Sequence, residues 1–271
     1  MGCVIQVVAD LTENDSFDQE FLNLCLVAGA LRTRFQPIVS LQLGRPAVWA
    51  LECLTRGPVG SRYEAADNMF GEARRLDLEP EVDRACIATA LETAAEAGLA
   101  HDLFVNAHPV TLRRDKGFAR FLRQTAQRCG IALERVTVEL IERGRDEVDV
   151  LLLQGLQLLR GAGVRIALDD FGAGKADHQV LCDCAPDFLK IDGALFRAAR
   201  RSRAERVQLD VLLNTCIARG AEPIAEGIED VWDLEMAAAG GIRLAQGYFL
   251  GRPVTADAVA GQWHGPTGAD A

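Results

Sequence analysis

The sequence contains no long hydrophobic run. Nowhere in its 271 residues are there about 18 consecutive apolar residues, the length that a membrane-spanning helix needs. Residues 1–4 offer neither the basic segment nor the apolar core of an export signal. We therefore expect a protein with no membrane partner and a cytoplasmic location.

The chain also lacks the cysteine and histidine spacing of a zinc site. Its eight cysteines are scattered through a chain that is too long to depend on disulfide bonds. Cys182 and Cys184 are separated by one residue and have no histidine pair nearby. We expect the cysteines to be buried, reduced thiols.

Basic residues are fewer than acidic ones. The chain has 29 Lys and Arg against 39 Asp and Glu, a formal charge of −10. Such a surface repels polyanions, so we expect no DNA or RNA polymer as a partner, and an anionic substrate would need local cations. Hydrophobic residues make up 49% and charged residues 25% of the chain, which is typical of a globular protein with one sizeable core.

Short β-like runs alternate with longer helical patterns from Phe35 onward, the order expected of βα units around a parallel sheet. The predicted strands cover residues 35–40, 47–54, 103–106, 136–140, 165–169, 188–191, 223–226 and 244–247. Apolar residues at helical spacing predict helices within 64–78, 81–97, 117–129, 146–159 and 204–219. The first two strands are joined only by residues 41–46, which is too short for a parallel crossover. The predicted fold is therefore α/β, a single modified TIM-like (β/α)8 barrel with an antiparallel first strand.

We predict three segments along the chain. Residues 1–31 form an N-terminal extension with one helix, residues 32–260 the barrel domain, and residues 261–271 a flexible tail. In the extension, Ser16 can cap a helix with one apolar stripe, which packs on the barrel or, as an alternative, forms a dimer contact. The stripe consists of Phe17, Phe21, Leu24, Ala28 and Leu31.

Polar residues lie near the carboxyl end of one predicted strand after another. They are Glu52, Asn106, Glu139, Asp169 with Asp170, Lys190, Glu226 and Gln246. In a barrel such side chains converge on one mouth, where these folds place their active sites. Carboxylates gathered there repel one another by about 4 kcal/mol per pair at ~4 Å with an effective dielectric of about 20, so they need cations. Oxygen ligands with no Cys or His favour Mg²⁺ or Mn²⁺, and a bridging carboxylate such as Asp169 can hold two ions.

Each element taken alone has a simpler interpretation. Asp169 and Asp170 can be a strand end with a helix cap. Lys190 can belong to a solvated turn, and Asn106 can be a satisfied turn amide. The metal-site hypothesis depends on the whole set, which occurs in order and in register with the strands.

The same residues lie in motifs that closely resemble the EAL family of cyclic di-GMP phosphodiesterases, from Phe35 to Pro253. In chain order the motifs are Phe35-Gln-Pro-Ile-Val39, Glu52-Cys-Leu-Thr-Arg56, Val105-Asn106, Glu139-Leu-Ile-Glu142, Asp169-Asp-Phe-Gly-Ala-Gly174, Lys190-Ile-Asp192, Glu226-Gly-Ile-Glu229 and Gln246-Gly-Tyr-Phe-Leu-Gly-Arg-Pro253. The resemblance implies a modified barrel with an antiparallel first strand, which agrees with the short first connection.

The resemblance also implies two metal ions, Mg²⁺ or Mn²⁺. They would be held by side-chain oxygens at five matching positions: Glu52, Asn106, Glu139, Asp169 and Asp170. The first four would bind one ion. Asp169 would also serve the second ion, together with Asp170.

Catalytic, substrate-binding and loop-bracing roles follow from the same resemblance. Lys190 would hold the attacking water, and Glu226 would act as general base or anchor that water. Arg56 would contact a substrate phosphate. The other residues of the substrate site would be Gln246 and Gln36, and the residue that braces the loop after Asp170 would be Glu142.

Three places depart from the pattern of the family. Cys53 stands where the signature has alanine, and Gly57 stands where an aromatic residue often follows the signature arginine. Lys175-Ala176-Asp177 replaces a segment that usually contains an aromatic and small hydroxyl residues. That loop links metal occupancy to dimer contacts in the family, so we expect it to affect regulation and rate rather than the ligand set.

The predicted function is metal-dependent hydrolysis of cyclic di-GMP to linear 5′-pGpG, which lowers this second messenger in bacterial signalling. One alternative is a catalytically weak or silent receptor for cyclic di-GMP, or a protein-interaction module. Another is an enolase-like lyase, in which barrel acids bind Mg²⁺ and a lysine abstracts a proton, although such enzymes carry a substantial capping domain. Family members often form dimers, so we expect a homodimer and allow for an unidentified regulatory protein.

Overall fold

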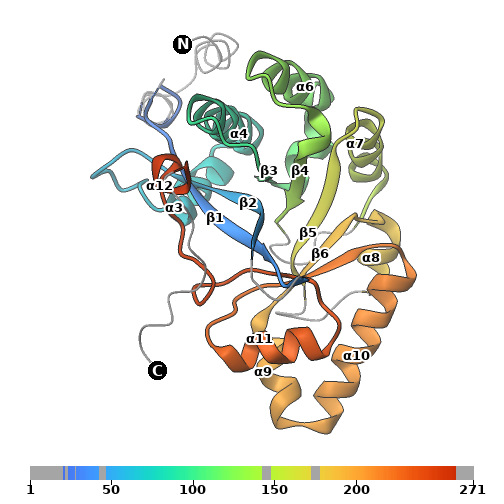
Figure 1. The fold of residues 1–271 in the computed structure, drawn as a ribbon. Helices are drawn as coiled ribbons and strands as arrows, with labels where there is room; N and C mark the ends of the chain where they lie inside the picture. Colours follow the sequence, from blue (N-terminus) through green and yellow to red (C-terminus); the bar gives the residue numbers. More distant parts are fainter. Residues whose placement is uncertain are drawn as a thin grey trace.

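The computed structural model describes residues 21, 24–27, 29–42, 47–141, 148–171 and 178–260. Within them, eight strands close into a barrel in which neighbours along the chain are neighbours in the sheet (Figure 1). The strands are β1 (Arg32–Ser40), β2 (Ala47–Arg56), β3 (Asp102–Ala107), β4 (Val136–Leu140), β5 (Arg165–Phe171), β6 (Phe188–Ile191), β7 (Glu222–Ala225) and β8 (Leu244–Ala245). The predicted α/β barrel is therefore confirmed, with small shifts at the strand ends.

Helices surround the strands of the barrel (Figure 1). Five of them correspond to the predicted helices: α3 (Ala66–Arg75), α4 (Glu79–Glu96), α6 (Phe118–Arg128), α7 (Val150–Gly161) and α10 (Arg203–Ala218). The structure adds α5 (Pro109–Arg114), the 3-10 turn η2 (Leu133–Arg135), α8 (His178–Cys184), α9 (Gly193–Arg201), α11 (Val231–Ala239) and α12 (Ala256–Ala260). None of these additional elements exceeds nine residues, which is too short to show a clear helical repeat in the sequence.

Strand β1 differs in direction from the others. It pairs antiparallel with β2 and β8, whereas the remaining neighbours pair in parallel. The predicted antiparallel first strand is confirmed, although residues 43–46 of its connection to β2 lie outside the described part of the chain. Because β1 runs backward, its first residues lie at the barrel end where the other strands finish. Gln36, for example, is opposite Glu52 in the ladder.

Side chains inside the barrel form a small apolar cluster that is separate from the larger outer core. The inner cluster consists of Ile38, Ala50, Phe104, Ala167, Phe188, Ile224 and Leu244. The outer core lies between strands and helices, and it joins Leu103 and Val138 to Leu91 and Leu156. Successive residues of a strand point to opposite faces, so each strand supplies alternate residues to the two clusters.

Part of the predicted N-terminal stripe packs on the barrel domain. Phe21 and Leu31 are buried in one hydrophobic cluster with residues of α3 and α4. Leu24 is 37% exposed, and Phe17 and Ala28 lie outside the described residues. The boundaries of the extension and of the tail remain predictions.

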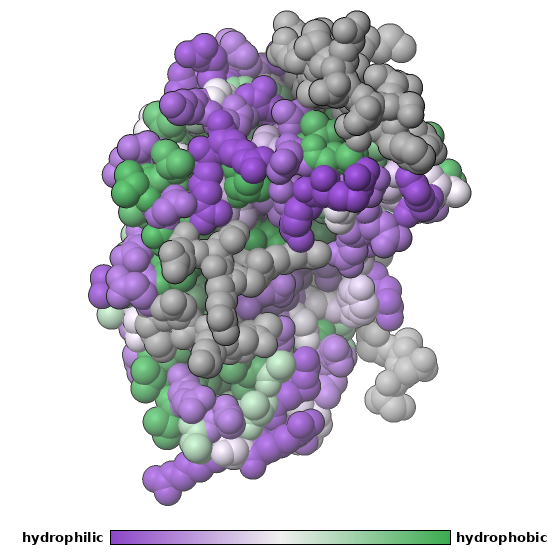
Figure 2. All heavy atoms as spheres, turned by 180° about the vertical axis from the view of Figure 1, so that it is seen from behind, coloured by the Kyte–Doolittle hydropathy of each residue, from purple (hydrophilic) through white to green (hydrophobic). Residues whose placement is uncertain are grey.

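The described helices include none long and apolar enough to cross a membrane. Figure 2 shows the face opposite to that of Figure 1, where hydrophilic and hydrophobic residues are interspersed. Val207 and Val211 of α10, for example, are 54% and 51% exposed. Scattered exposed apolar residues of this kind are normal on folded proteins.

Gly155 of α7 lies at a close approach between α7 and α5. A Cβ atom there would be 2.8 Å from the carbonyl oxygen of Leu112 and 2.9 Å from its Cβ. Gly155→Ala should lower the free energy of unfolding by about 1–3 kcal/mol, because the crowded helices must move apart. Urea unfolding followed by circular dichroism measures the change.

Gly161, in the same helix, provides the matched control. Apart from its chain neighbours and the adjacent backbone of its own helix, no atom of the described residues lies within 4 Å of the Cβ position at Gly161. Gly161→Ala should leave the free energy of unfolding unchanged or raise it by up to about 1 kcal/mol, since alanine loses less backbone freedom than glycine. Equal effects of the two substitutions would show that Gly155 is not crowded.

Candidate active site

Eight polar or charged residues, one for each strand, surround the mouth of the barrel. They are Gln36, Glu52, Asn106, Glu139, Asp169, Lys190, Glu226 and Gln246, and we call them the mouth layer. Each lies two positions along the chain from a buried residue that fills the barrel: Ile38, Ala50, Phe104, Thr137, Ala167, Phe188, Ile224 or Leu244. Residues two apart in a strand share a face, so the mouth layer is the next level of the barrel interior.

Lys190 lies at the centre of the mouth layer. Its side chain has no exposed surface, and its Nζ contacts four carboxylates, three from β2, β4 and β5 and one from the residue after β7. The distances from Nζ are 2.5 Å to Glu139 Oε1, 3.0 Å to Asp169 Oδ1, 3.2 Å to Glu226 Oε1 and 3.4 Å to Glu52 Oε2. The predicted convergence of these residues on one mouth is therefore observed.

The mouth layer carries more negative than positive charge, because the single Lys190 ammonium contacts four carboxylates. Burial raises the pKa of Glu139 well above its ordinary value, and the nearby charge of Asp169 raises it further. Burial also raises the pKa of Glu226, although Lys190 acts in the opposite direction. Asp169 differs, since the charge of Lys190 and hydrogen bonds outweigh burial and lower the pKa of this carboxyl.

The ammonium of Lys190 is stabilised by its carboxylate partners. Burial alone would lower the pKa of Lys190, because the charged group loses its hydration. Attraction from Asp169 and Glu139, with smaller effects of Glu226 and Glu52, raises the pKa of Lys190 well above its usual range. A lysine in this state keeps its proton at neutral pH and supplies positive charge.

Asp169 and Asp170 both belong to the site although they are consecutive residues of β5. In a regular strand such neighbours point to opposite faces. The pairing of β5 with β6 changes register between Leu168 and Phe171, and Asp170 has a φ of 52°. This irregularity redirects the second carboxylate, so that ligand atoms of Asp169, Asp170 and Glu226 all lie within 4.8 Å of one another.

The oxygen atoms of the mouth layer fit a hard divalent cation. Glu139 Oε2, Glu226 Oε2 and Gln246 Oε1 are buried, and the described residues provide no hydrogen bond to them. A buried polar atom without a partner costs about 1–3 kcal/mol. A cation among these carboxylate and amide oxygens would satisfy them and reduce the excess negative charge.

A cavity of about 190 Å³ opens beside the mouth layer. Its lining includes mouth-layer residues and one neighbour: Glu52, Asn106, Asp169 and Asp170. Further lining residues come from the end of β2, from α3 and α4, and from the residue before α5; they include Arg56, Phe70, Cys86, Ile87 and His108. Arg56 therefore lines the same cavity as the carboxylates of Glu52, Asp169 and Asp170.

Amide side chains orient the Glu52 carboxylate from two sides. Gln246 Nε2 donates a hydrogen bond to Glu52 Oε2, and Asn106 Nδ2 lies 3.4 Å from Glu52 Oε1. The third amide of the layer, Gln36, donates from Nε2 to the carbonyl oxygen of Gly251 at 3.2 Å. The mouth layer is thus connected by hydrogen bonds as well as by ion pairs.

Two departures from the family pattern have a structural explanation. A Cβ atom at Gly57 would lie 2.0 Å from the carbonyl oxygen of Tyr63, because the loop after β2 folds back on this position. Cys53 is buried in the packing outside the barrel, and burial raises the pKa of its thiol well above the usual range. Glu142 and the departure Lys175-Ala176-Asp177 lie outside the described residues, so the bracing role remains a prediction.

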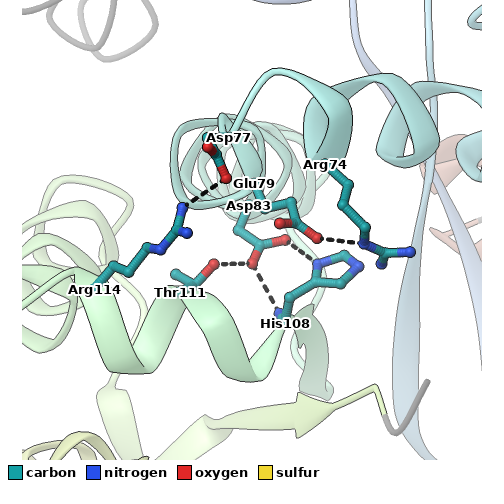
Figure 3. Close-up of polar contacts among 7 residues, drawn as sticks. All are labelled: Arg74, Asp77, Glu79, Asp83, His108, Thr111 and Arg114. Carbon is teal, nitrogen blue, oxygen red and sulfur yellow. Dashed lines mark hydrogen bonds and ion pairs between the residues drawn. The ribbon is translucent and has the colours of Figure 1, made fainter. Parts of the chain in front are cut away.

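The sequence analysis did not select three residues that shape the site: Phe70, Asp83 and His108. Phe70 and His108 line the cavity, with ring centroids 4.5 Å apart. Asp83 contacts His108 through a buried carboxylate (Figure 3). One signal could have drawn attention to Asp83, since it lies on the apolar face of α4, three and four residues before Cys86 and Ile87.

Removing the ammonium of Lys190 should destabilise the metal-free protein. Breaking a buried ion pair on one side costs about 3–5 kcal/mol, so Lys190→Met should lower the free energy of unfolding by this amount at pH 8. The loss should be smaller at pH 5. Glu139 and Glu226 have folded-state pKa values above their unfolded values, so the folded protein binds their protons more strongly and is favoured at low pH; this contribution is lost as the pH rises. Protonated Glu139 and Glu226 carry no charge, so they depend less on the missing ammonium at pH 5.

Urea unfolding in EDTA at the two pH values measures this difference. Arg243→Met is the control, because Arg243 forms a largely exposed ion pair with Glu222 and such pairs contribute little. It should leave the free energy of unfolding nearly unchanged at both pH values. A Lys190→Met protein that is as stable as the wild type at pH 8 would contradict the charge balance described above.

The sequence is similar to a known protein family and to proteins named as cyclic di-GMP phosphodiesterases. The EAL domain profile matches residues 19–253. Cyclic di-GMP phosphodiesterase PdeB of Shewanella oneidensis is 27% identical over 195 residues, which cover 71% of this chain and 23% of that protein. Cyclic di-GMP phosphodiesterase PdeA of Borreliella burgdorferi is 26% identical over 191 residues, which cover 69% and 28%. The chain thus spans about a quarter of the length of these relatives.

Solved structures of similar fold include complexes with cyclic di-GMP. BlrP1 of Klebsiella pneumoniae, in a manganese/cy-diGMP complex, has a TM-score of 0.76 at 27% identity, over 85% of this chain and 58% of that one. A standalone EAL protein of Vibrio cholerae O395 in its c-di-GMP bound form has a TM-score of 0.72 at 25% identity, over 85% and 94%. Because the profile match covers most of the chain and the barrel agrees with these structures, the chain belongs to the EAL domain family.

Proposed function

We propose that this chain hydrolyses cyclic di-GMP to linear 5′-pGpG with Mg²⁺ or Mn²⁺, and so lowers the concentration of this second messenger in the bacterial cytoplasm. The observation that carries the proposal is the excess of carboxylates in the mouth layer, where four of them share the Lys190 ammonium. The names of PdeB and PdeA and the cyclic di-GMP complexes of similar structures support the choice of substrate.

Two ions would be held by five side chains: Glu52, Asn106, Glu139, Asp169 and Asp170. Two observations support this set. Glu139 keeps a buried oxygen without a partner among the described residues, and the backbone turns Asp170 toward Asp169. When bound, the ions would polarise a phosphate oxygen and lower the pKa of a water molecule.

Lys190 and Glu226 would position and activate the attacking water. The ammonium of Lys190 stays charged because its carboxylate partners raise its pKa, so it can hold a water oxygen. Glu226 would accept the proton or anchor the water. Its side chain is 24% exposed, more than the other three carboxylates around Lys190, so water can reach it.

Arg56 would bind a substrate phosphate from the cavity wall. The protein carries a formal charge of −10, so an anionic substrate depends on local positive charge at this mouth. Arg56, Lys190 and the bound ions would provide it. Gln36 and Gln246 would complete the substrate site.

A cyclic di-GMP receptor without turnover is the second candidate. It is favoured by one observation, namely that Lys190 already neutralises part of the carboxylate charge, so the mouth can form without ions. The lyase alternative is not supported, because the raised pKa of Lys190 makes it a poor proton acceptor and the EAL match covers residues 19–253. The homodimer and the regulatory protein remain predictions.

Chromatography of cyclic di-GMP incubated with the purified protein tests the proposal. We expect 5′-pGpG to form with Mg²⁺ or with Mn²⁺. Loss of an outer-shell partner of a metal typically costs 10–100-fold, so loss of a direct ligand in Glu52→Ala should reduce turnover by more than about 100-fold. Glu222→Ala is the control, since Glu222 lies at the opposite end of its strand from the mouth.

The outcomes separate the two candidates. Tight binding of cyclic di-GMP without product in either ion would reject the hydrolase and support the receptor. Normal turnover by Glu52→Ala would instead show that the metal ligands are assigned wrongly.

Ca²⁺ should support binding of cyclic di-GMP but little hydrolysis. Its coordination shell is larger and looser than that of Mg²⁺, so turnover should be lower by at least about 10-fold. BlrP1 also has a solved calcium/cy-diGMP complex. Equilibrium binding and turnover, each measured in Ca²⁺ and in Mg²⁺, check the prediction, and equal turnover in the two ions would contradict it.

A further inference from the structure

A buried carboxylate outside the mouth layer holds the segment that follows Asn106. Asp83 of α4 has no exposed surface, and three hydrogen-bonding contacts connect it to two residues after β3 (Figure 3). Asp83 Oδ2 accepts hydrogen bonds from the backbone N–H of His108 at 2.8 Å and from the hydroxyl of Thr111 at 2.5 Å. Asp83 Oδ1 lies 2.9 Å from Nδ1 of His108.

Strand pairing alone supports this segment on one side only. Asn106 is paired with β4, but the ladder between β3 and β2 ends at Val105. Three residues beyond Val105, the backbone N–H of His108 donates a hydrogen bond to Asp83 of α4. The carboxylate thus continues the support of β3 past the end of its ladder.

Asp83 also takes the place of a helix cap. α5 begins at Pro109, and the preceding residue, His108, makes no capping hydrogen bond with its own side chain. The carboxylate from α4 instead binds His108 and Thr111 across the first turn. The turn from His108 to Thr111, which begins two residues after Asn106, is therefore held against α4.

The side-chain contact of Asn106 within the mouth layer is weak. Its Nδ2 lies 3.4 Å from Glu52 Oε1, which is long for a hydrogen bond. The direction of the Asn106 side chain therefore depends on the backbone that carries it. A buried carboxylate such as Asp83 adds little net stability, because desolvation offsets its hydrogen bonds, but it imposes a defined geometry.

We propose that Asp83 is a positioning residue for the metal ligand Asn106, acting through its contacts with His108 and Thr111. The inference rests on the proposed metal site. Loss of the Asp83 oxygens frees the turn after β3, and the side-chain amide oxygen of Asn106 then spends less time facing the ion.

Mn²⁺ binding to the metal-free protein tests this without a hydrolysis assay. Asp83→Leu keeps the number and branching of side-chain heavy atoms, although it is bulkier, and it removes both oxygens. It should weaken Mn²⁺ binding by about 10-fold, the lower end of the loss expected when a group that orients a metal ligand is removed. Asp83→Asn keeps an acceptor for the N–H of His108, so its Mn²⁺ affinity should stay within about 3-fold of the wild type. Calorimetry measures the affinity, and circular dichroism confirms folding.

Asp77→Asn is the matched control. Asp77 lies just before α4 and forms an exposed ion pair with Arg114 of α5, 3.1 Å apart (Figure 3). Asparagine tolerates the φ of 59° at this position, so only the charge is lost. The variant should bind Mn²⁺ as the wild type does. If Asp83→Leu does not fold, Thr111→Val removes one of the contacts with a smaller change and should weaken Mn²⁺ binding by about 3-fold.

Each result decides the matter. Weak Mn²⁺ binding by Asp83→Leu beside near-normal binding by Asp83→Asn supports the proposal, and a kcat that recovers at saturating Mn²⁺ distinguishes it from general damage. Wild-type Mn²⁺ affinity in a folded Asp83→Leu protein would overturn the proposal. If Asp83→Leu does not fold, wild-type Mn²⁺ affinity in Thr111→Val would overturn it. Equal losses of Mn²⁺ affinity in Asp83→Leu and Asp83→Asn would also overturn it. A wild-type protein that binds Mn²⁺ but does not hydrolyse cyclic di-GMP would reject the proposed function and leave this test valid.

Discussion

One buried ammonium surrounded by carboxylates holds the mouth of this barrel together. Lys190 Nζ lies 2.5–3.4 Å from oxygens of four residues, three from β2, β4 and β5 and one from the residue after β7. Removing such charges from water is costly, and only close partners offset the cost. These partners meet only when the sheet closes, so barrel closure and assembly of the site are the same event.

The alternation of strand residues explains why the site is one level of the barrel interior. Apolar side chains such as Phe104 and Ile224 fill the level beneath, and the mouth layer begins two residues further along each strand. A slip of one residue would turn a site residue outward into the helix layer and an apolar residue into the mouth. The inner cluster therefore fixes the register on which the charged residues depend.

The sequence allowed the strands and most of the mouth layer to be predicted, because its polar residues lie near the carboxyl ends of short β-like runs in a chain of βα units. Gln36 is the exception, since it lies near the start of β1 and followed only from the family resemblance. The direction of Asp170 could not be predicted, since it depends on a positive φ and a change of register between β5 and β6. The short helices could not be predicted either, because they contain too few residues to show a helical repeat of apolar residues in the sequence. Asp83 was missed because its partners, His108 and Thr111, lie 25 and 28 residues away and only the folded chain brings them together.

Two kinds of buried carboxylate can be told apart by their unused oxygens. Asp83 and Glu139 both have no exposed surface, but each oxygen of Asp83 has a partner in the protein. Glu139 gives one oxygen to Lys190 and keeps the other without a partner among the described residues. The fully hydrogen-bonded carboxylate of Asp83 can fix geometry, whereas Glu139 has an oxygen available to bind a cation. Asp83 shows the first kind in the helix layer around the barrel, and Glu139 shows the second kind at the mouth.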